Sequence, residues 1–208
     1  MIGTAQIIAR IDAAPQVKNP SRPRRGRAKL ATILAVMLGG LFCATAARAQ
    51  APTEYQVKAA FLFNFTKFVE WPASAFRSGS ATIQICLVGE DPLGKALEDL
   101  VKGQQVGGRS LAVRRLAQSP RDDNCQMAFL AGLDKGRAEQ ILAPLKSLPI
   151  LTVVDHEDGG DAGAMIAFVV EDNKVRFNIN LDTVERAGVK LSSKLLKLAK
   201  AVREKGGR

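Results

Sequence analysis

EYQVKAAFLFNFTKFVEWP, residues 54–72, is the stretch of this sequence that decides the fold. It holds four of the nine phenylalanines and the only tryptophan of the chain. Large apolar side chains recur in it at spacings of four and three residues, the pattern of one helix face: Val57, Phe61, Phe65 and Phe68. Thr53 can cap such a helix through its hydroxyl oxygen, and Pro72 helps to end it. The stretch therefore predicts a largely buried helix whose aromatic side chains belong to the core.

Residues 1–49 are expected to be a secretory signal peptide. A basic segment (residues 22–29) precedes an apolar run of 13 residues (30–42), and Ala47-Arg48-Ala49 has small residues where signal peptidase cleaves. The apolar run is too short to span a bilayer, which takes about 20 residues. We therefore expect export to the periplasm and cleavage after Ala49.

Other interpretations of this leader have less support. The arginine pair at residues 24–25 is typical of twin-arginine export, but residues 26–27 are not the hydrophobic pair that this signal needs. Cys43 would suit a lipoprotein, but Phe42 before it is too bulky for that cleavage site. The long segment before the basic residues leaves open a start codon downstream of Met1.

Removal of the leader changes the charge of the protein. Residues 1–49 contain eight Lys or Arg and one Asp, so the rest of the chain keeps 22 basic and 19 acidic residues, a net charge of about +3 instead of +10. The high isoelectric point therefore comes mostly from the leader and does not indicate nucleic-acid binding. The remaining 159 residues suit one domain with a proper core.

Two cysteines remain after cleavage, Cys86 and Cys125. An even number of cysteines in an oxidising compartment favours a disulfide. Both residues also belong to predicted neighbouring strands, which makes their proximity plausible. A pair of buried free thiols is the alternative, whereas a redox-active pair is disfavoured because the chain has no C-x-x-C motif.

The rest of the sequence alternates between strand and helix patterns. Strands are predicted at residues 83–88, 111–116, 126–130, 150–154, 165–170 and 175–180, and helices at 93–101, 137–147 and 191–203. The C-terminal helix is expected to bury Leu191, Leu195, Leu198 and Val202. Strands that alternate with helices indicate an α/β fold. We predict one layered α/β domain over residues 50–208, with a mostly parallel sheet that ends in an antiparallel C-terminal hairpin and is flanked by helices.

The sequence offers little for catalysis. His156 is the only histidine, so no cluster of histidines can hold a metal. The acidic loop at residues 155–158 could bind a cation, although such a loop is usually a solvated turn. The glycines at residues 103–108 lack the spacing of a dinucleotide site. The turn at residues 89–94 lies where α/β sheets bind ligands; its two acids would repel phosphate but leave room for a small polar or aromatic ligand. We expect no catalytic residue, no metal and no cofactor.

Five blocks of the sequence resemble the YfiR family of small periplasmic proteins. They are residues 54–72, 85–89 (ICLVG), 163–168 (GAMIAF), 175–180 (VRFNIN) and 187–199 (AGVKLSSKLLKLA). The resemblance implies an α/β fold that forms homodimers, and it matches Cys86 and Cys125 to the first disulfide of the family. The best-studied members carry a second disulfide, which this chain cannot form because no cysteine follows Cys125.

The resemblance implies a regulator rather than an enzyme. The best-known members bind the periplasmic sensor domain of an inner-membrane diguanylate cyclase and hold the enzyme inactive, which lowers cyclic-di-GMP and disfavours biofilm formation. We expect the same kind of partner here and no direct contact with membrane or nucleic acid. The alternative is a periplasmic protein that binds a small ligand or a cell-wall fragment, and an enzyme is the third possibility.

Partner contacts are expected in the C-terminal third of the chain. A strand at residues 175–180 on the edge of the sheet would offer unpaired backbone groups, and a row of lysines on the last helix could face an acidic sensor domain. The expected contact residues are Val175, Phe177, Ile179, Lys194, Lys197 and Lys200. The lysine row could equally be a plain solvated helix face.

Overall fold

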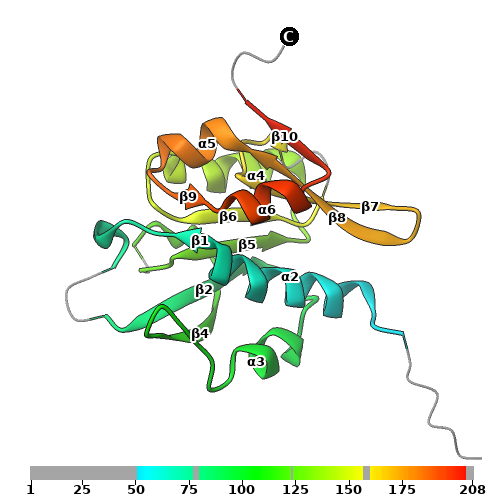
Figure 1. Ribbon diagram of the computed structural model, residues 1–208. Coiled ribbons are helices and arrows are strands. Elements are labelled where there is room, and N and C mark those ends of the chain that lie inside the picture. Colours follow the sequence, from blue (N-terminus) through cyan, green and yellow to red (C-terminus); the bar gives the residue numbers. More distant parts are fainter. Residues whose placement is uncertain (1–50, 77–79, 123, 157–159, 205–208) are drawn as a thin grey trace, which may run out of the picture. The chain divides into compact units, whose positions relative to one another are not determined.

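The structure is a computed structural model that describes residues 51–76, 80–122, 124–156 and 160–204 (Figure 1). The expected signal peptide lies outside the described residues. Within them, eight strands form one sheet in the spatial order β10 (Ala201–Arg203), β8 (Lys174–Asn180), β7 (Ile166–Glu171), β6 (Leu151–Val154), β5 (Met127–Ala131), β2 (Thr82–Gly89), β4 (Arg109–Leu116) and β3 (Gln105–Val106). Strands β7, β6, β5, β2 and β4 are parallel, and β8 pairs antiparallel with β7. The predicted α/β fold with a mostly parallel sheet and a C-terminal hairpin is confirmed.

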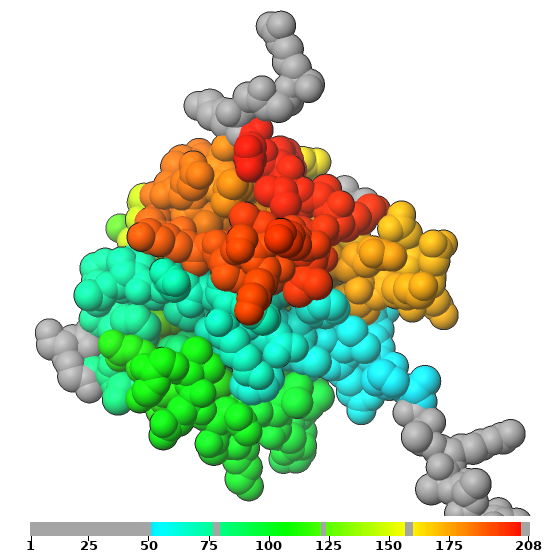
Figure 2. Space-filling model, in the orientation of Figure 1, coloured from blue at the N-terminus to red at the C-terminus, as the bar shows by residue number. Residues whose placement is uncertain are grey.

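Helices cover both faces of the sheet. Helices α2 (Glu54–Phe68), α3 (Lys95–Val101) and α6 (Ser193–Leu198) pack on one face, where they share a core with alternate residues of the strands. Helix α4 (Lys135–Leu142) and the 3-10 turn η3 (Ala143–Leu145), which takes up Pro144, pack on the opposite face. Figure 2 shows α2 and the C-terminal segment side by side on the first face.

Helix α2 forms where the aromatic stretch predicts it. Thr53 caps it in a capping box, because Gln56 N–H donates to the Thr53 hydroxyl while Thr53 N–H donates to the Gln56 side chain. Phe65 is buried against Phe168 of β7 and Phe177 of β8, with ring centroids 6.0 and 5.1 Å away. The helix ends at Phe68, because the next two residues form β1 (Val69–Glu70) and pair with β9 (Lys190–Leu191).

The prediction of one C-terminal helix over residues 191–203 is wrong. Helix α6 ends at Leu198, Ala199 is extended, and the chain then forms β10 at the edge of the sheet. Leu195 is buried, but Leu198 is 63% exposed and Val202 37% exposed, so neither is a core residue. The edge of β8 explains why the helix stops, because residues 201–203 form backbone hydrogen bonds with β8 in place of a further helical turn.

Two other features of the C-terminal third were not predicted. Helix α5 (Leu181–Arg186) follows β8 directly and is capped by Asn180, whose side chain accepts the N–H of Thr183 at 3.3 Å. Strand β8 is not an edge strand along its full length, because β10 pairs with its residues 178–180. Only its first half stays at the edge.

Candidate functional site

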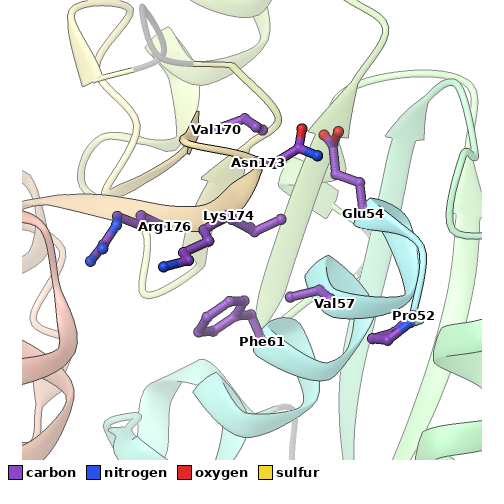
Figure 3. A pocket seen from close by; sticks show the side chains of 9 residues that line it. Pro52, Glu54, Val57, Phe61, Val170, Asn173, Lys174 and Arg176 are labelled. Carbon is purple, nitrogen blue, oxygen red and sulfur yellow. The ribbon is translucent and has the colours of Figure 1, made fainter.

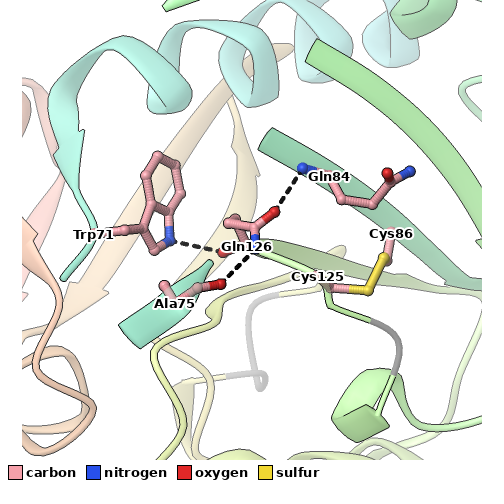
Figure 4. The surroundings of a disulfide bond; sticks show 6 residues. All are labelled: Trp71, Ala75, Gln84, Cys86, Cys125 and Gln126. Carbon is pink, nitrogen blue, oxygen red and sulfur yellow. Dashed lines mark hydrogen bonds between the residues drawn. A yellow bond between two sulfur atoms is a disulfide. The ribbon is translucent and has the colours of Figure 1, made fainter. Parts of the chain in front are cut away.

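Cys86 and Cys125 are joined in a disulfide (Figure 4). Cys86 lies on β2, and Cys125 comes two residues before β5, the strand next to β2. Their Cα atoms are 6.0 Å apart, and both residues are buried on the α4 face of the sheet. Because the bond is buried beneath α4, it reinforces the pairing of β2 with β5 and leaves no thiol available for exchange chemistry.

Gln126, beside the disulfide, is a buried polar residue whose role the sequence did not reveal. Its side chain accepts the Gln84 N–H at 2.8 Å and donates to the Ala75 carbonyl at 2.6 Å, while its backbone carbonyl accepts the Trp71 indole N–H at 2.8 Å (Figure 4). These bonds satisfy a group that would otherwise be costly to bury. They tie the segment after β1 to the sheet, so the role of Gln126 is structural.

The six expected partner residues separate into two groups. Phe177 and Ile179 are buried in the core against α2, so their side chains are not available to a partner in this structure. Lys194 and Lys197 are exposed on α6. Lys200 lies after the helix, and its ammonium is 3.3 Å from a Glu171 carboxylate oxygen. Partner binding by the accessible residues stays a prediction.

Val175, the remaining expected residue, belongs to the free half of the β8 edge. Strand β10 covers residues 178–180, and the N–H of Lys200 donates to the Phe177 carbonyl at 2.8 Å. No described strand pairs with the outer edge of residues 174–176. The first half of β8 therefore keeps backbone groups that can pair with another chain.

A groove lies beside this free edge, between the start of α2 and the β7–β8 hairpin (Figure 3). Its volume is about 620 Å³. Its lining combines apolar side chains with a charged rim: Pro52, Val57, Phe61, Val170 and Val175 are apolar, and Glu54, Asn173, Lys174 and Arg176 are polar. Val170 is 52% exposed, which is unusual for a β-branched residue of a strand. An apolar floor, a rim with charges of both signs and a free strand edge together suit an extended segment of another protein.

Three charged residues connect this groove to the sheet. Lys58 of α2 is only 2% exposed, and its ammonium contacts Glu54 of the groove and lies 2.5 Å from Asp155, which follows β6. Burial by itself lowers the pKa of Lys58, but hydrogen bonds to Asp155 and Glu54 outweigh it and raise that pKa. Burial raises the pKa of Asp155, against the opposing effect of Lys58. Glu54 and Lys58 are four residues apart on a helix, a spacing at which an ion pair can be predicted from the sequence. The ion pair of Lys58 with Asp155 joins residues far apart in the chain and could not be predicted in this way.

The described residues contain no group of three or more His, Cys, Asp or Glu side chains that could hold a metal ion. Among the same residues, none of the helices combines the length and the apolar character that crossing a membrane requires. The groove itself offers apolar contacts, charged side chains and a strand edge.

The sequence from residue 55 to residue 200 matches the YfiR/HmsC-like family. The chain belongs to this family. The match begins in α2 and ends just before β10, so it includes the disulfide, the groove and the buried Lys58. Membership supports, at the level of the family, a periplasmic regulator of a diguanylate cyclase.

Proposed function

We propose that this protein is a periplasmic repressor that binds the periplasmic domain of an inner-membrane diguanylate cyclase and lowers cyclic-di-GMP. The family match over residues 55–200 is the observation that carries this proposal. The groove and the free β8 edge support it, because they suit protein recognition. We also propose that the protein is exported by the signal peptide at residues 1–49 and acts as a homodimer, which light scattering after size exclusion tests.

Repression requires only that the protein prefers the inactive conformation of its partner. An exported protein cannot touch a cytoplasmic catalytic domain, so the signal crosses the membrane through the partner. A preference of about 3 kcal/mol for the inactive state shifts the partner's equilibrium more than a hundredfold. A contact area of ordinary size around the groove can supply this difference.

A genetic experiment tests the function. Deletion of the gene should raise cyclic-di-GMP and surface attachment, and a second deletion that removes the partner cyclase should abolish the rise. Unchanged cyclic-di-GMP in the single deletion, under conditions where the protein is made, would count against repression and favour the small-ligand alternative.

Matched variants test the groove. Val170→Glu places a charge among the apolar side chains that line the groove and should abolish repression. Leu100→Glu is the control: it also places a charge at an exposed apolar position, but on α3 away from the groove, and should leave repression intact. Lys174→Glu and Lys197→Glu compare the groove rim with the α6 lysine row. Loss of repression in Lys197→Glu alone would move the contact surface from the groove to α6. Circular dichroism and soluble yield check that each variant folds.

A further inference from the structure

A second pocket lies at the carboxyl ends of three parallel strands, where the chain changes direction in the sheet. After β2 the chain passes through α3 on one face to β4; it then crosses back to β5 and continues into α4 on the opposite face. The ends of β2 and β5 thus form a topological switch point, and open α/β sheets bind ligands just outside such points. We call the cavity there the switch-point pocket; its volume is about 420 Å³.

The lining of the switch-point pocket has two chemical parts. Tyr55, Pro92 and Leu133 supply an aromatic ring and apolar surface. Glu90, Asp134 and Asp155 supply carboxylates. They outnumber the nearby ammonium groups, which are Lys135 of the lining and Lys58, the ion-pair partner of Asp155. The pocket therefore has an apolar wall and a negative charge, and phosphate or carboxylate ligands are disfavoured.

Gly132 leaves room for the Glu90 side chain at the end of β5. Gly132 follows β5 with φ +65°, and a Cβ atom there would lie 2.4 Å from Cδ of Glu90. A side chain at Gly132 would therefore push the Glu90 carboxylate away from the end of β5. The backbone N–H of Glu90 donates to the Ala131 carbonyl at 3.0 Å. The Glu90 carboxylate makes no hydrogen bond or ion pair with any residue that the structure describes. Glu90 is exposed, so its carboxylate lies at the mouth of the cavity, where a ligand can reach it.

We propose that the switch-point pocket binds a small organic amine with an aromatic or apolar ring, and that its occupancy is transmitted to the groove through Lys58. The ammonium group would lie between Glu90 and Asp155, and the ring would pack against Tyr55 and Leu133. His156 completes the polar side of the site: its Nε2 is buried and has no hydrogen-bond partner among the described residues.

Helix α2 provides the transmission, and this step rests on the proposed function of the groove. Tyr55 lines the switch-point pocket, Glu54 lines the groove, and Lys58 contacts Asp155 of the pocket as well as Glu54 of the groove. The Lys58 ammonium is also 5.0 Å from the centre of the Tyr55 ring. A bound cation that pairs with Asp155 weakens the ion pair between Asp155 and Lys58. The first turn of α2, and the groove beside it, must then change conformation.

Titration of the exported protein with matched probes tests the site. Tyramine should bind, and 4-hydroxyphenylacetate, which has the same ring but a negative charge, should not. Glu90→Gln should weaken tyramine binding about tenfold, which is a modest loss for one charge contact. Glu139→Gln removes a charge from the exposed side of α4, outside the pocket, and should change the affinity less than about twofold. Equal binding of both probes, no binding of tyramine, or an affinity that Glu90→Gln leaves unchanged would each overturn the proposal.

Nuclear magnetic resonance tests the transmission without any partner. Tyramine should shift the backbone amide signals of Val170, Lys174 and Arg176 in the groove. Glu54→Ala, which removes the acceptor that Lys58 contacts, should remove more than half of that shift while tyramine still binds. Tyramine binding without a groove shift would refute the transmission and leave the site standing. Unchanged cyclic-di-GMP in the gene deletion would instead refute the proposed function and leave both results here intact.

Discussion

Lys58 is the residue whose surroundings say most about how this protein works. A lysine near the start of an aromatic helix could have pointed to solvent, but Lys58 is buried and forms ion pairs with both Glu54 and Asp155. Such a group is costly to bury unless both partners are present. It therefore fixes the first turn of α2 against the end of β6, which positions one wall of the groove.

Lys58→Met should lower the free energy of unfolding by about 3–5 kcal/mol, because it leaves the carboxylate of Asp155 buried without its counter-charge. Adding Asp155→Asn to this variant should recover most of the loss. Lys95→Met is the control: that side chain is 80% exposed, and its loss should cost less than about 1 kcal/mol. Urea unfolding of the four proteins provides the measurement, and equal losses for Lys58→Met and Lys95→Met would contradict the prediction.

The pH dependence of stability should carry the signature of Asp155. Its pKa is raised above 3.8 because of burial, so the folded protein holds this proton more tightly than the unfolded chain. The stabilisation from this proton is complete below the unfolded pKa and is lost as the pH rises through the raised value. Asp155→Asn cannot titrate, so it should gain stability relative to the wild type as the pH rises. Urea unfolding at several pH values gives the free energy of unfolding of both proteins. If the variant's free energy minus that of the wild type stays constant or falls as the pH rises, the prediction is wrong.

The disulfide should contribute to stability and not to function. It closes a loop with a sequence separation of 39 residues, and replacing both Cys86 and Cys125 by alanine should cost about 2–4 kcal/mol. In the presence of reductant, the wild type should unfold at the same denaturant concentration as the double variant. Reductant should leave the unfolding midpoint of the double variant unchanged. Two alkylatable thiols in protein freshly taken from the periplasm would contradict the bond.

At the scale of elements, the sequence predicted the helices and strands that depend on interactions between residues close together in the chain. The aromatic spacing of α2 and the cap at Thr53 were sufficient for that helix, and the apolar runs were sufficient for the parallel strands. The C-terminal helix was extended too far because residues 199–203 keep an amphipathic pattern, while their actual partner, β8, lies more than 20 residues away in sequence. Helix α5 could have been found, since Asn180 is a good cap and Asp182 and Arg186 suit its two ends.

A substitution at Lys200 tests whether β10 depends on its backbone bond to β8. Lys200→Pro removes the N–H that donates to Phe177, and should destabilise the protein by about 1–3 kcal/mol and speed hydrogen exchange in residues 201–203. Lys200→Ala keeps that N–H and removes only the ion pair with Glu171, so it should cost less than about 1 kcal/mol. Similar effects of both substitutions would show that the side chain, not the backbone, holds β10.

At the scale of the whole domain, the sequence indicated the fold class and the family but not the groove. The groove combines the start of α2 with the hairpin at residues 170–176, which are more than 100 residues apart in the chain. The expected contacts on residues 175–180 were based on the backbone of an edge strand, which does not tell which side chains face the core, and Phe177 is buried. The hairpin residues that line the groove are Val170 and residues 173–176, none of which is fully buried.

Export links the leader, the disulfide and repression in one prediction. Leu34→Arg places a charge inside the apolar run at residues 30–42, which signal recognition does not tolerate. The variant should stay in the cytoplasm with its leader attached, and it should keep both cysteines as alkylatable thiols because that compartment is reducing. It should also fail to repress cyclic-di-GMP synthesis, since the periplasmic domain of the proposed partner lies across the membrane. Intact-mass spectrometry should find the wild type starting at Gln50 and lighter by two hydrogens than the dithiol form. Thr32→Ser, a conservative change in the same run, is the control and should export normally. Repression by a variant that is shown to remain in the cytoplasm would refute action on a periplasmic domain.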